Sequence, residues 1–164
     1  ARAMRLFIAI QLSQEIKKKL VGVLHDLKKQ GVEGNYVPAQ NLHVTLAFIG
    51  EYGDPAAVKE VIGRVPLPEF RLSLSETGNF GNILWAGIKG NQKLKTYVKE
   101  LRSALAAAGI PCDKEKFVPH ITLIRKVSAK KAYRVSIPKA EMMVKKVSLM
   151  KSEQKNGKMV YREL

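Results

Sequence analysis

The sequence predicts a mixed fold of helices and strands, arranged as two similar β-α-β lobes related by a pseudo-twofold axis. Strand-like and helix-like segments alternate along the 164 residues, and the second half repeats the order of the first at a spacing of 77 positions. Hydrophobic residues make up 46% of the chain, which is enough for a core without disulfides or metal ions. We therefore expect a single domain over residues 1–164, with repeat halves at roughly 4–80 and 81–164.

The first half opens with a strand and a long amphipathic helix. The segment RLFIAIQL (5–12) is apolar and β-prone, and Ser13 after it is a suitable N-cap. Gly31 predicts the end of the helix. The apolar positions of this helix follow helical spacing: Ile16, Leu20, Val23, Leu24 and Leu27. Their side chains define the face that we expect to meet the core.

A polar loop, a strand, a short helix and another strand complete the first half. The first of these strands is expected at 43–48, and GDPAAVKEVIGR then begins a helix with Asp54 as its N-cap and Pro55 in its first turn. The segment EFRLSLSE (69–76) alternates between apolar and polar residues, which is typical of a half-buried strand.

The second half begins in the same way, with a strand at ILWAGIKG (83–90) followed by a helix. Asn91 is the expected N-cap, and Gly109 with Pro111 beyond it predicts where the helix ends. Apolar residues again mark one face of the helix: Leu94, Val98, Leu101, Leu105 and Ala108. The remaining chain predicts four strands, at 120–125, 133–137, 143–150 and 158–163.

The chain is strongly basic, with 29 Lys and Arg residues against 14 Asp and Glu residues and a net charge of +15. The lysines are spread along the chain rather than gathered in one block, which favours a folded basic surface over a disordered tail. A polyanion such as nucleic acid is therefore the first partner to consider, although a basic surface also serves solubility.

Two further features restrict the class of protein. No apolar run approaches the roughly 20 residues of a membrane span, so we expect neither a membrane partner nor a secretory signal. Cys112 is the only cysteine, which excludes an intrachain disulfide and a Cys-based zinc site. We therefore expect a cytoplasmic protein.

The strongest functional signal is a short pattern that occurs once in each half, HVTL beginning at His43 and HITL beginning at His120. Side chains two residues apart in a strand point to the same face, so each histidine shares a face with its threonine, Thr45 or Thr122. The apolar neighbours are expected in the core: Val44, Leu46 and Phe48 in the first strand, and Ile121, Leu123 and Ile124 in the second. A pseudo-twofold axis between the strands would bring both imidazoles and both hydroxyls to one groove.

Two imidazoles and two hydroxyls in one groove suit a phosphodiester. The hydroxyls can donate to the two non-bridging oxygens, while one imidazole removes a proton from water and the other protonates the leaving oxygen. A reference pKa of about 6.5 makes both protonation states of histidine accessible near neutral pH. This chemistry requires no metal.

Other interpretations of these residues are weaker. A single strand histidine is usually a hydrogen-bonded structural residue, but two in matched surroundings favour a functional pair. Neither histidine has Asp, Glu or Cys at the spacing of metal ligands, so no metal site is expected. No nucleophile-elbow pattern is present, and nothing in the segment around Cys112 marks it as catalytic. His25, inside the first helix, is expected to be a surface or packing residue.

The segments NYVPAQNLHVTLAFIG and FVPHITLIRK resemble the paired H-x-T motifs of the two-histidine (2H) phosphoesterases. They are most similar to the RNA 2′,3′-cyclic phosphodiesterase branch, the LigT-like proteins also named 2′-5′ RNA ligases. The opening MRLFIAIQL resembles that branch as well, so the likeness covers essentially the whole chain from Met4. The sequence departs from the family pattern at Tyr36, where tryptophan is frequent, and at Ile124, where a smaller residue is frequent. Both departures leave the nucleobase preference open.

The resemblance implies a bilobal α+β fold with antiparallel sheets lining a central cleft. It also implies hydrolysis of an RNA terminal 2′,3′-cyclic phosphate to a 2′-phosphate, without a metal or other cofactor. His43 would be the proton donor to the leaving O3′, and His120 the proton acceptor that activates water. Thr45 and Thr122 would hold the phosphate oxygens, and Arg125 would add a charge-assisted contact.

The same resemblance suggests how RNA would bind. Tyr36 could stack a nucleobase at the rim of the site, whereas Phe48 is expected in the core. The expected partner of the monomeric protein is an RNA that ends in a 2′,3′-cyclic phosphate or carries a 2′-5′ link. Reversal of the proton transfers with an RNA 5′-hydroxyl would give 2′-5′ ligation, so the roles of the two histidines could be exchanged. Two alternatives stay open: a non-catalytic module that binds RNA 3′ ends, and a cyclic phosphodiesterase of small nucleotides.

Overall fold

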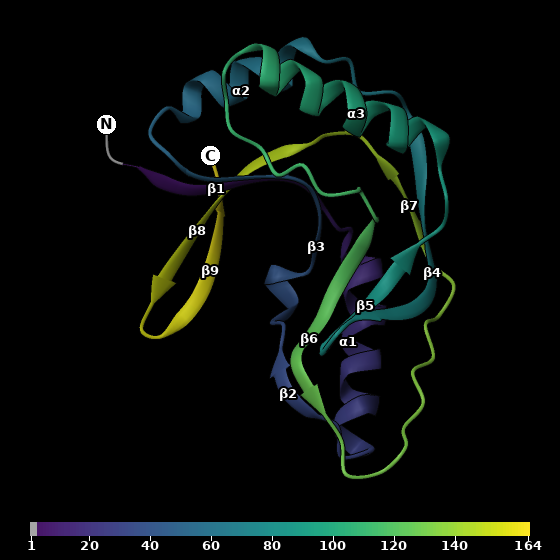
Figure 1. The fold of residues 1–164 in the computed structure, drawn as a ribbon. Helices are drawn as coiled ribbons and strands as arrows, with labels where there is room; N and C mark the ends of the chain where they lie inside the picture. The colour runs from purple at the N-terminus through teal and green to yellow at the C-terminus, as the bar shows by residue number, and fades with distance from the viewer. Residues whose placement is uncertain (1–2) are drawn as a thin grey trace.

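Residues 3–164 are described by a computed structural model, which contains three α-helices and nine strands (Figure 1). The strands form two antiparallel sheets. The elements of the first half are β1 (Met4–Gln11), α1 (Gln14–Lys29), β2 (Glu33–Tyr36), a 3₁₀ turn (Ala39–Asn41), β3 (His43–Tyr52), α2 (Pro55–Arg64) and β4 (Phe70–Phe80). Those of the second half are β5 (Ile83–Ile88), α3 (Gln92–Ala107), β6 (His120–Ser128), β7 (Glu141–Val144), β8 (Ser148–Lys155) and β9 (Lys158–Glu163). The expected α+β class with antiparallel sheets is confirmed.

The two sheets each combine strands from both halves of the chain. One sheet has the order β3-β1-β8-β9, and the other has the order β2-β6-β5-β4-β7. A shift of 77 positions places β1, α1, β3 and β4 on β5, α3, β6 and β8. Strand β4, which ends the first repeat, pairs with β5, whereas β8, which ends the second, pairs with β1. The repeats therefore exchange their last strands, and neither sheet belongs to one half alone.

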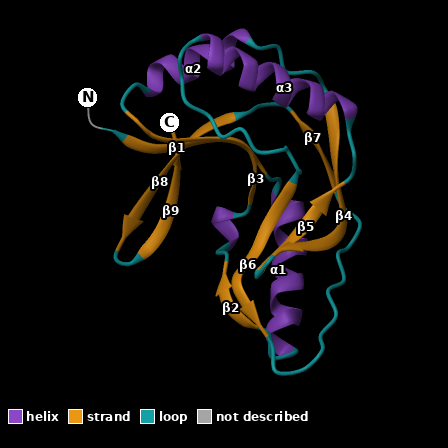
Figure 2. Cartoon of the chain, viewed as in Figure 1, coloured by secondary structure: helices purple, strands orange, loops and turns teal. Residues whose placement is uncertain are grey.

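The helices begin where the capping residues predict. The side-chain oxygens of Ser13, Asp54 and Asn91 each accept a hydrogen bond from the backbone N–H three residues later, at 3.3, 3.1 and 3.2 Å. Helices α2 and α3 contact each other and run together along one side of the molecule, away from α1 (Figure 2). Among residues 3–164, no helix is long and apolar enough to cross a membrane.

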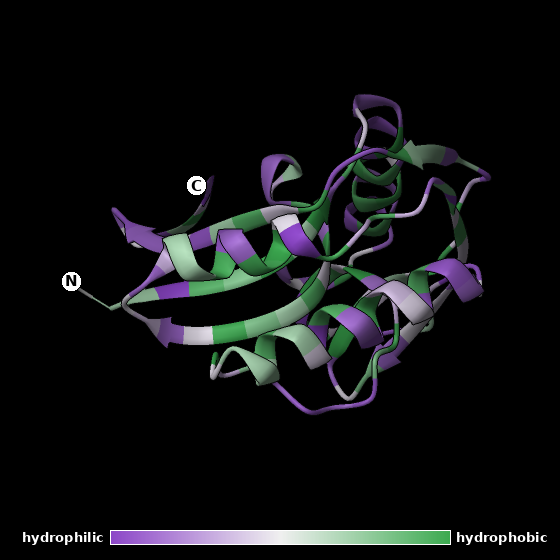
Figure 3. Ribbon diagram, turned by 90° about the horizontal axis from the view of Figure 1, so that it is seen from above, coloured by the Kyte–Doolittle hydropathy of each residue, from purple (hydrophilic) through white to green (hydrophobic). Residues whose placement is uncertain are grey.

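Most of the core is one cluster of buried side chains drawn from both sheets and all three helices. The middle of the long strands is hydrophobic, while the outer loops are hydrophilic (Figure 3). A smaller cluster of Phe7, Ala9 and Met150 lies on the other face of the first sheet, with Phe48 and Tyr161 packed against it. This second cluster supports the region of the first histidine.

The predicted strand at 133–137 is wrong, because this segment pairs with no strand within residues 3–164 and runs past the end of α1. Within this segment the side chain of Gln30 binds the backbone of Arg134, donating to its carbonyl oxygen at 2.7 Å and accepting from its N–H at 2.9 Å. The predicted strand at 143–150 is two strands, β7 and β8, with a break between Val144 and Ser148.

Strand β2 lies within the segment that the sequence assigned to a polar loop. Its residues EGNY have little intrinsic preference for a strand, and its formation depends on pairing with β6. Gly34 has φ of +146°, and a Cβ there would lie 2.6 Å from the side chain of Ile124 and 2.8 Å from the carbonyl oxygen of Arg125. Glycine is therefore what allows this strand to approach β6.

Candidate active site

The two predicted histidines stand at equivalent places in the two sheets. His43 is the first residue of β3 and His120 is the first residue of β6. Strand β3 is the edge of its sheet, and it lies against β6 of the other sheet (Figure 1). The H-x-T segments of the two halves are thus brought together where the sheets meet.

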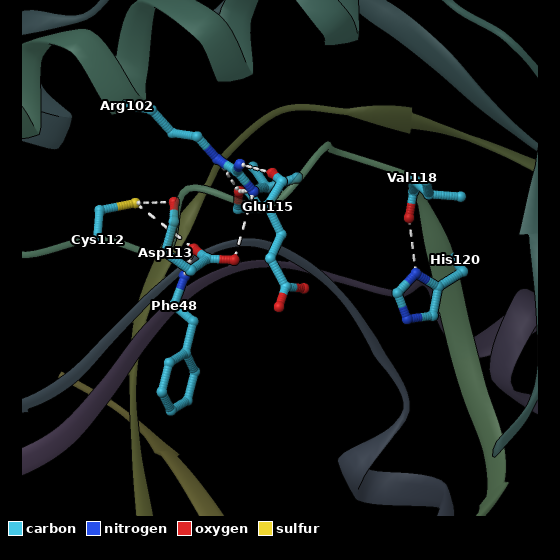
Figure 4. Close-up of polar contacts among 8 residues, drawn as sticks. Phe48, Arg102, Cys112, Asp113, Glu115, Val118 and His120 are labelled. Atoms are coloured by element: carbon cyan, nitrogen blue, oxygen red, sulfur yellow. Dashed lines mark hydrogen bonds and ion pairs between the residues drawn. The ribbon is translucent and has the colours of Figure 1, made fainter. Parts of the chain in front are cut away.

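The same backbone contact orients both imidazoles. The Nδ1 atom of His43 lies 2.6 Å from the carbonyl oxygen of Asn41. That of His120 lies 2.6 Å from the carbonyl oxygen of Val118, as Figure 4 shows. A carbonyl oxygen can only accept, so Nδ1 carries a proton in each ring. The atom left for proton transfer is therefore Nε2 in both histidines.

The surroundings of His43 are tight and aromatic. Its Nε2 atom lies 2.8 Å from the hydroxyl oxygen of Thr45. The rings of Phe7 and Tyr161 lie 5.0 and 5.2 Å from the imidazole, centroid to centroid. Burial lowers the pKa of His43 below its usual value, and the carbonyl of Asn41 opposes this shift only in part.

Positive charges also act on His43. The charges of Arg125, His120 and Lys17 each lower its pKa further, after burial as the main cause. The free site thus favours neutral His43. A bound phosphate would place negative charge beside the ring and favour the protonated form.

His120 lies in a more open aromatic setting. Phe80 meets its ring edge to face at a centroid distance of 5.0 Å, and Trp85 lies at 5.8 Å. Thr122 stands opposite Trp85 in the β5–β6 pairing. No hydrogen-bond partner of His120 Nε2 occurs within residues 3–164, so this atom is available to a water molecule or a substrate.

Each histidine strand contains a bulge three residues after the histidine. In β3, Ala47 pairs with Ile8 and Thr45 with Ala9, so Leu46 is an extra residue; a second register shift follows at Ile49, between Phe48 and Gly50. In β6, Ile124 pairs with Leu84 and Thr122 with Trp85, so Leu123 is the extra residue. The alternation of faces therefore changes after both positions.

The bulges decide the position of the fifth residue after each histidine. Two consecutive residues, 46–47 in β3 and 123–124 in β6, point into the core, so Phe48 and Arg125 turn to the face of the histidines. The expectation that Phe48 shares the core face of Leu46 is wrong for this reason. Arg125 is exposed and lies close enough for its charge to lower the pKa of His43.

A cavity of about 1230 Å³ opens beside His43 and Thr45. Tyr36, Phe48 and Arg125 also line it, whereas His120 and Thr122 do not belong to its wall. Its further walls carry basic side chains from distant parts of the chain: Arg5, Lys28 and Lys158. The cavity therefore extends from the first histidine along a basic surface.

Tyr36 is fixed at the wall of this cavity by two contacts. Its hydroxyl donates to the carbonyl oxygen of Val32 at 2.6 Å, and the Nζ atom of Lys28 lies 4.9 Å from the centre of its ring. The ring is thus available at the cavity from one side. Its use as a nucleobase platform stays a prediction.

Four aromatic residues beside the histidines were not predicted from the sequence: Phe7, Tyr161, Phe80 and Trp85. They belong to other strands, and they do not match one another at the spacing of 77 positions. Asn41 was also not predicted, and its side-chain Nδ2 donates to the carbonyl oxygen of Met159 at 2.9 Å. The only available signal was the place of Phe7 in the family-like segment MRLFIAIQL.

The arrangement can support acid and base catalysis by two imidazoles. Nδ1 is engaged in both rings, the Thr45 hydroxyl lies beside Nε2 of His43, and the charge of Arg125 acts on the same histidine. No group of three or more His, Cys, Asp or Glu side chains within residues 3–164 has the arrangement of a metal site. That the reaction needs no metal stays a prediction.

Comparison with known proteins agrees with the resemblance seen in the sequence. Residues 10–156 match the family model of the 2′-5′ RNA ligase superfamily. The RNA 2′,3′-cyclic phosphodiesterase of Thermotoga maritima is 33% identical over 132 residues, which are 74% of this chain and 70% of that protein. The enzyme of the same name from Escherichia coli K12 is 34% identical over 131 residues, 76% of this chain and 73% of that protein.

A solved structure extends the likeness to the whole fold. The crystal structure of E. coli LigT complexed with 3′-AMP superimposes with a TM-score of 0.81 at 31% identity, covering 100% of this chain and 96% of that one. The shared fold includes the parts of the chain that carry both histidines.

Proposed function

The chain belongs to the 2′-5′ RNA ligase superfamily, and on that basis we propose that it hydrolyses the terminal 2′,3′-cyclic phosphate of RNA to a 2′-phosphate. The observation that carries the proposal is the pair of H-x-T strands, one from each sheet, with both imidazoles oriented through Nδ1. The relatives named RNA 2′,3′-cyclic phosphodiesterase support this substrate.

In the proposed reaction, Nε2 of His120 removes one proton from a water molecule, and the water oxygen attacks phosphorus. The bond between phosphorus and O3′ breaks, and Nε2 of His43 delivers its proton to O3′. The products are a 2′-phosphate and a free 3′-hydroxyl. His120 then releases its proton to solvent and His43 regains one, which completes the cycle.

Three side chains stabilise the phosphate in this scheme. Thr45 and Thr122 donate from their hydroxyls to the non-bridging oxygens, and Arg125 offers a charged donor. The negative phosphate also favours protonated His43, whose pKa is lowered in the free protein. The acid is therefore charged mainly when substrate is present.

The size and charge of the cavity support RNA rather than a small nucleotide. About 1230 Å³ is more than the 300–1,000 Å³ of typical small-molecule sites, which leaves room for more than the terminal nucleotide. Arg5 and Lys158 lie on its wall and match the phosphates of a longer chain. The RNA 5′-hydroxyl can replace water in the reverse reaction, which would give 2′-5′ ligation at the same residues.

The site draws both histidines from one chain, which supports a monomer as the active form. We also propose the cytoplasm as its location, because a chain with a single cysteine has no intrachain disulfide that an oxidising compartment would form. Sedimentation of the pure protein tests the first of these assignments.

The deciding experiment incubates the protein with an RNA that ends in a 2′,3′-cyclic phosphate and identifies the product by chromatography. We expect a 2′-phosphate, and we expect His43→Ala and His120→Ala each to lower the rate by about 10²-fold or more while the protein stays folded. His25→Ala, a surface histidine on α1, is the control and should leave the rate unchanged. Binding without turnover by the parent protein would identify a non-catalytic RNA module instead.

Two additions to this experiment test the metal and the substrate length. EDTA should leave the rate unchanged, and strong inhibition would show that a metal takes part. Arg5→Ala and Lys158→Ala should lower kcat/KM for an oligonucleotide but not for a mononucleoside 2′,3′-cyclic phosphate. An equal loss on both substrates would contradict the proposed path for a longer RNA.

A further inference from the structure

We infer that Arg102, on helix α3, positions the two strands that carry the histidines, and that Asp113 completes this clamp. The inference rests on the proposed function, because it assigns these residues a part in that reaction. The clamp has two arms, one to the bulge of β3 and one to the chain segment that leads into β6 (Figure 4).

The first arm grips the extra residue of the β3 bulge. Arg102 donates from Nε and Nη2 to the carbonyl oxygen of Leu46, at 3.1 and 2.9 Å. Leu46 has no partner on β1, and β3 is the edge strand of its sheet, so no strand pairs with it from the other side. Arg102 therefore supplies the donors that a neighbouring strand would otherwise supply.

The second arm holds the segment before His120. Nη1 of Arg102 donates to the carbonyl oxygen of Glu115 at 2.7 Å, and the guanidinium lies 5.7 Å from the centre of the Phe117 ring. Glu115 stands only five residues before His120, so fixing it restricts where β6 begins. One guanidinium thus connects the strands of both histidines.

Asp113 extends the clamp along the open edge of β3. Its Oδ1 accepts the N–H of Phe48 at 2.8 Å, and its own N–H donates to the carbonyl oxygen of Phe48 at 2.9 Å. Its other carboxylate oxygen lies 3.8 Å from Nη2 of Arg102. Both hydrogen-bonding groups of Phe48 are therefore held, directly after the bulge that turns this residue toward the site.

The clamp matters for the geometry of the site because the position of a bulge along a strand can shift. A shift of register by one residue turns every following side chain to the opposite face of a strand. In β3 this would return Phe48 to the core side and disturb Thr45, which directly precedes the bulge. Errors of about 1 Å in the placement of reacting groups can lower a rate by about 10²-fold.

Arg102 acts from outside the substrate cavity. It lines a separate cavity of about 640 Å³ on the outer side of α3 and does not belong to the wall beside His43. Its side chain is 20% exposed. We therefore assign it a positioning part and no contact with RNA.

The test compares Arg102→Ala and Asp113→Ala with Asp113→Asn and with Lys99→Ala. Lys99 lines the same outer cavity as Arg102 but makes no hydrogen bond to β3, so it is the matched control. We expect both Arg102→Ala and Asp113→Ala to lower kcat by about 10-fold to 10²-fold with KM changed less than about 3-fold. Asp113→Asn keeps an acceptor for Phe48 and should retain kcat, as should Lys99→Ala.

Amide hydrogen exchange provides a measurement that does not depend on activity. Exchange at Phe48 should be faster in Asp113→Ala than in the parent, and unchanged in Asp113→Asn and Lys99→Ala. If Arg102→Ala fails to fold, the comparison of Asp113→Ala with Asp113→Asn tests the inference by itself. A folded Arg102→Ala or Asp113→Ala protein with parental kcat overturns the inference. If the parent protein has no activity on the cyclic phosphate, the proposed function is refuted. The exchange rate at Phe48 still shows in that case whether Asp113 holds its backbone.

Discussion

His43 and His120 share one backbone contact and differ in their surroundings. The carbonyl two residues before each ring fixes Nδ1–H, but His43 lies between Phe7 and Tyr161 while His120 borders Phe80 and Trp85. Burial and nearby positive charges lower the pKa of His43. The two halves of the repeat thus supply the same group in two different environments, which suits two different roles in proton transfer.

The roles of the two histidines can be separated with a substrate in which sulfur replaces O3′. A thiolate leaves readily without protonation, so loss of the acid should matter less on this substrate than on the natural one. We expect the rate loss of His43→Ala to shrink on the 3′-thio substrate and that of His120→Ala to stay the same. The opposite outcome would exchange the two assignments.

The lowered pKa of His43 predicts how stability depends on pH. Above the unfolded value of 6.5, His43 is neutral in both states and contributes no pH dependence. As the pH falls from 6.5 toward the lower folded pKa, the unfolded chain binds a proton that the folded protein does not, so stability decreases. Below the folded pKa, both states are protonated and the loss stops growing.

This prediction is checked by urea unfolding between pH 8 and pH 5 of the parent and of His43→Gln. The variant should lose less free energy of unfolding between these pH values, because it lacks this proton-binding difference. Curves that run parallel for the two proteins would show that burial of His43 does not shift its pKa.

In each histidine strand, the bulge three residues after the histidine determines which later side chain faces the site. The extra residues Leu46 and Leu123 are buried, and they turn Phe48 and Arg125 to the side of the imidazoles. Strand β4 makes a different contribution, because Gly78 lies directly opposite Trp85 on β5. The indole covers this glycine and reaches toward Phe80 and His120.

Replacing Gly78 by alanine tests this contribution of β4. The new Cβ would overlap the indole of Trp85, so we expect the ring to move and the protein to lose about 1–3 kcal/mol of stability. Trp85 is the only tryptophan, and its fluorescence should change in the folded state. Gly63→Ala on α2, where a Cβ meets nothing within 4 Å, is the control and should leave the fluorescence unchanged. Unchanged fluorescence in Gly78→Ala would contradict the close contact.

At the scale of the whole molecule, the exchange of β4 and β8 ties the two repeats together. Each sheet contains strands from both halves, and one cluster of buried side chains spans them. Separation of the halves would require β8 to leave β1 and β4 to leave β5. The single-domain interpretation of residues 1–164 stays a prediction that this topology favours.

We therefore expect the protein to unfold in one cooperative transition. The fluorescence of Trp85 reports on the sheet of β5, whereas far-UV circular dichroism reports on all helices and strands. Their midpoints in urea should coincide within experimental error. Two separated midpoints would indicate lobes that unfold independently.

Features that depend only on neighbouring residues in the chain could be predicted from the sequence alone. Ser13, Asp54 and Asn91 begin the helices as predicted, because an N-cap acts within one turn. His43 and Thr45 share a face because they are two residues apart in a strand and no bulge lies between them.

Features that depend on a partner strand could not be predicted from the sequence and appear only in the tertiary structure. The bulge at Leu46 exists in relation to β1, so the sequence placed Phe48 on the wrong face. Strand β2 forms from residues with a weak strand preference because it pairs with β6, whereas the segment 133–137 is irregular and Gln30 binds the backbone of Arg134 within it. Alternation along a chain is a local rule, whereas register, strand exchange and the contacts of Arg102 arise only when distant segments meet.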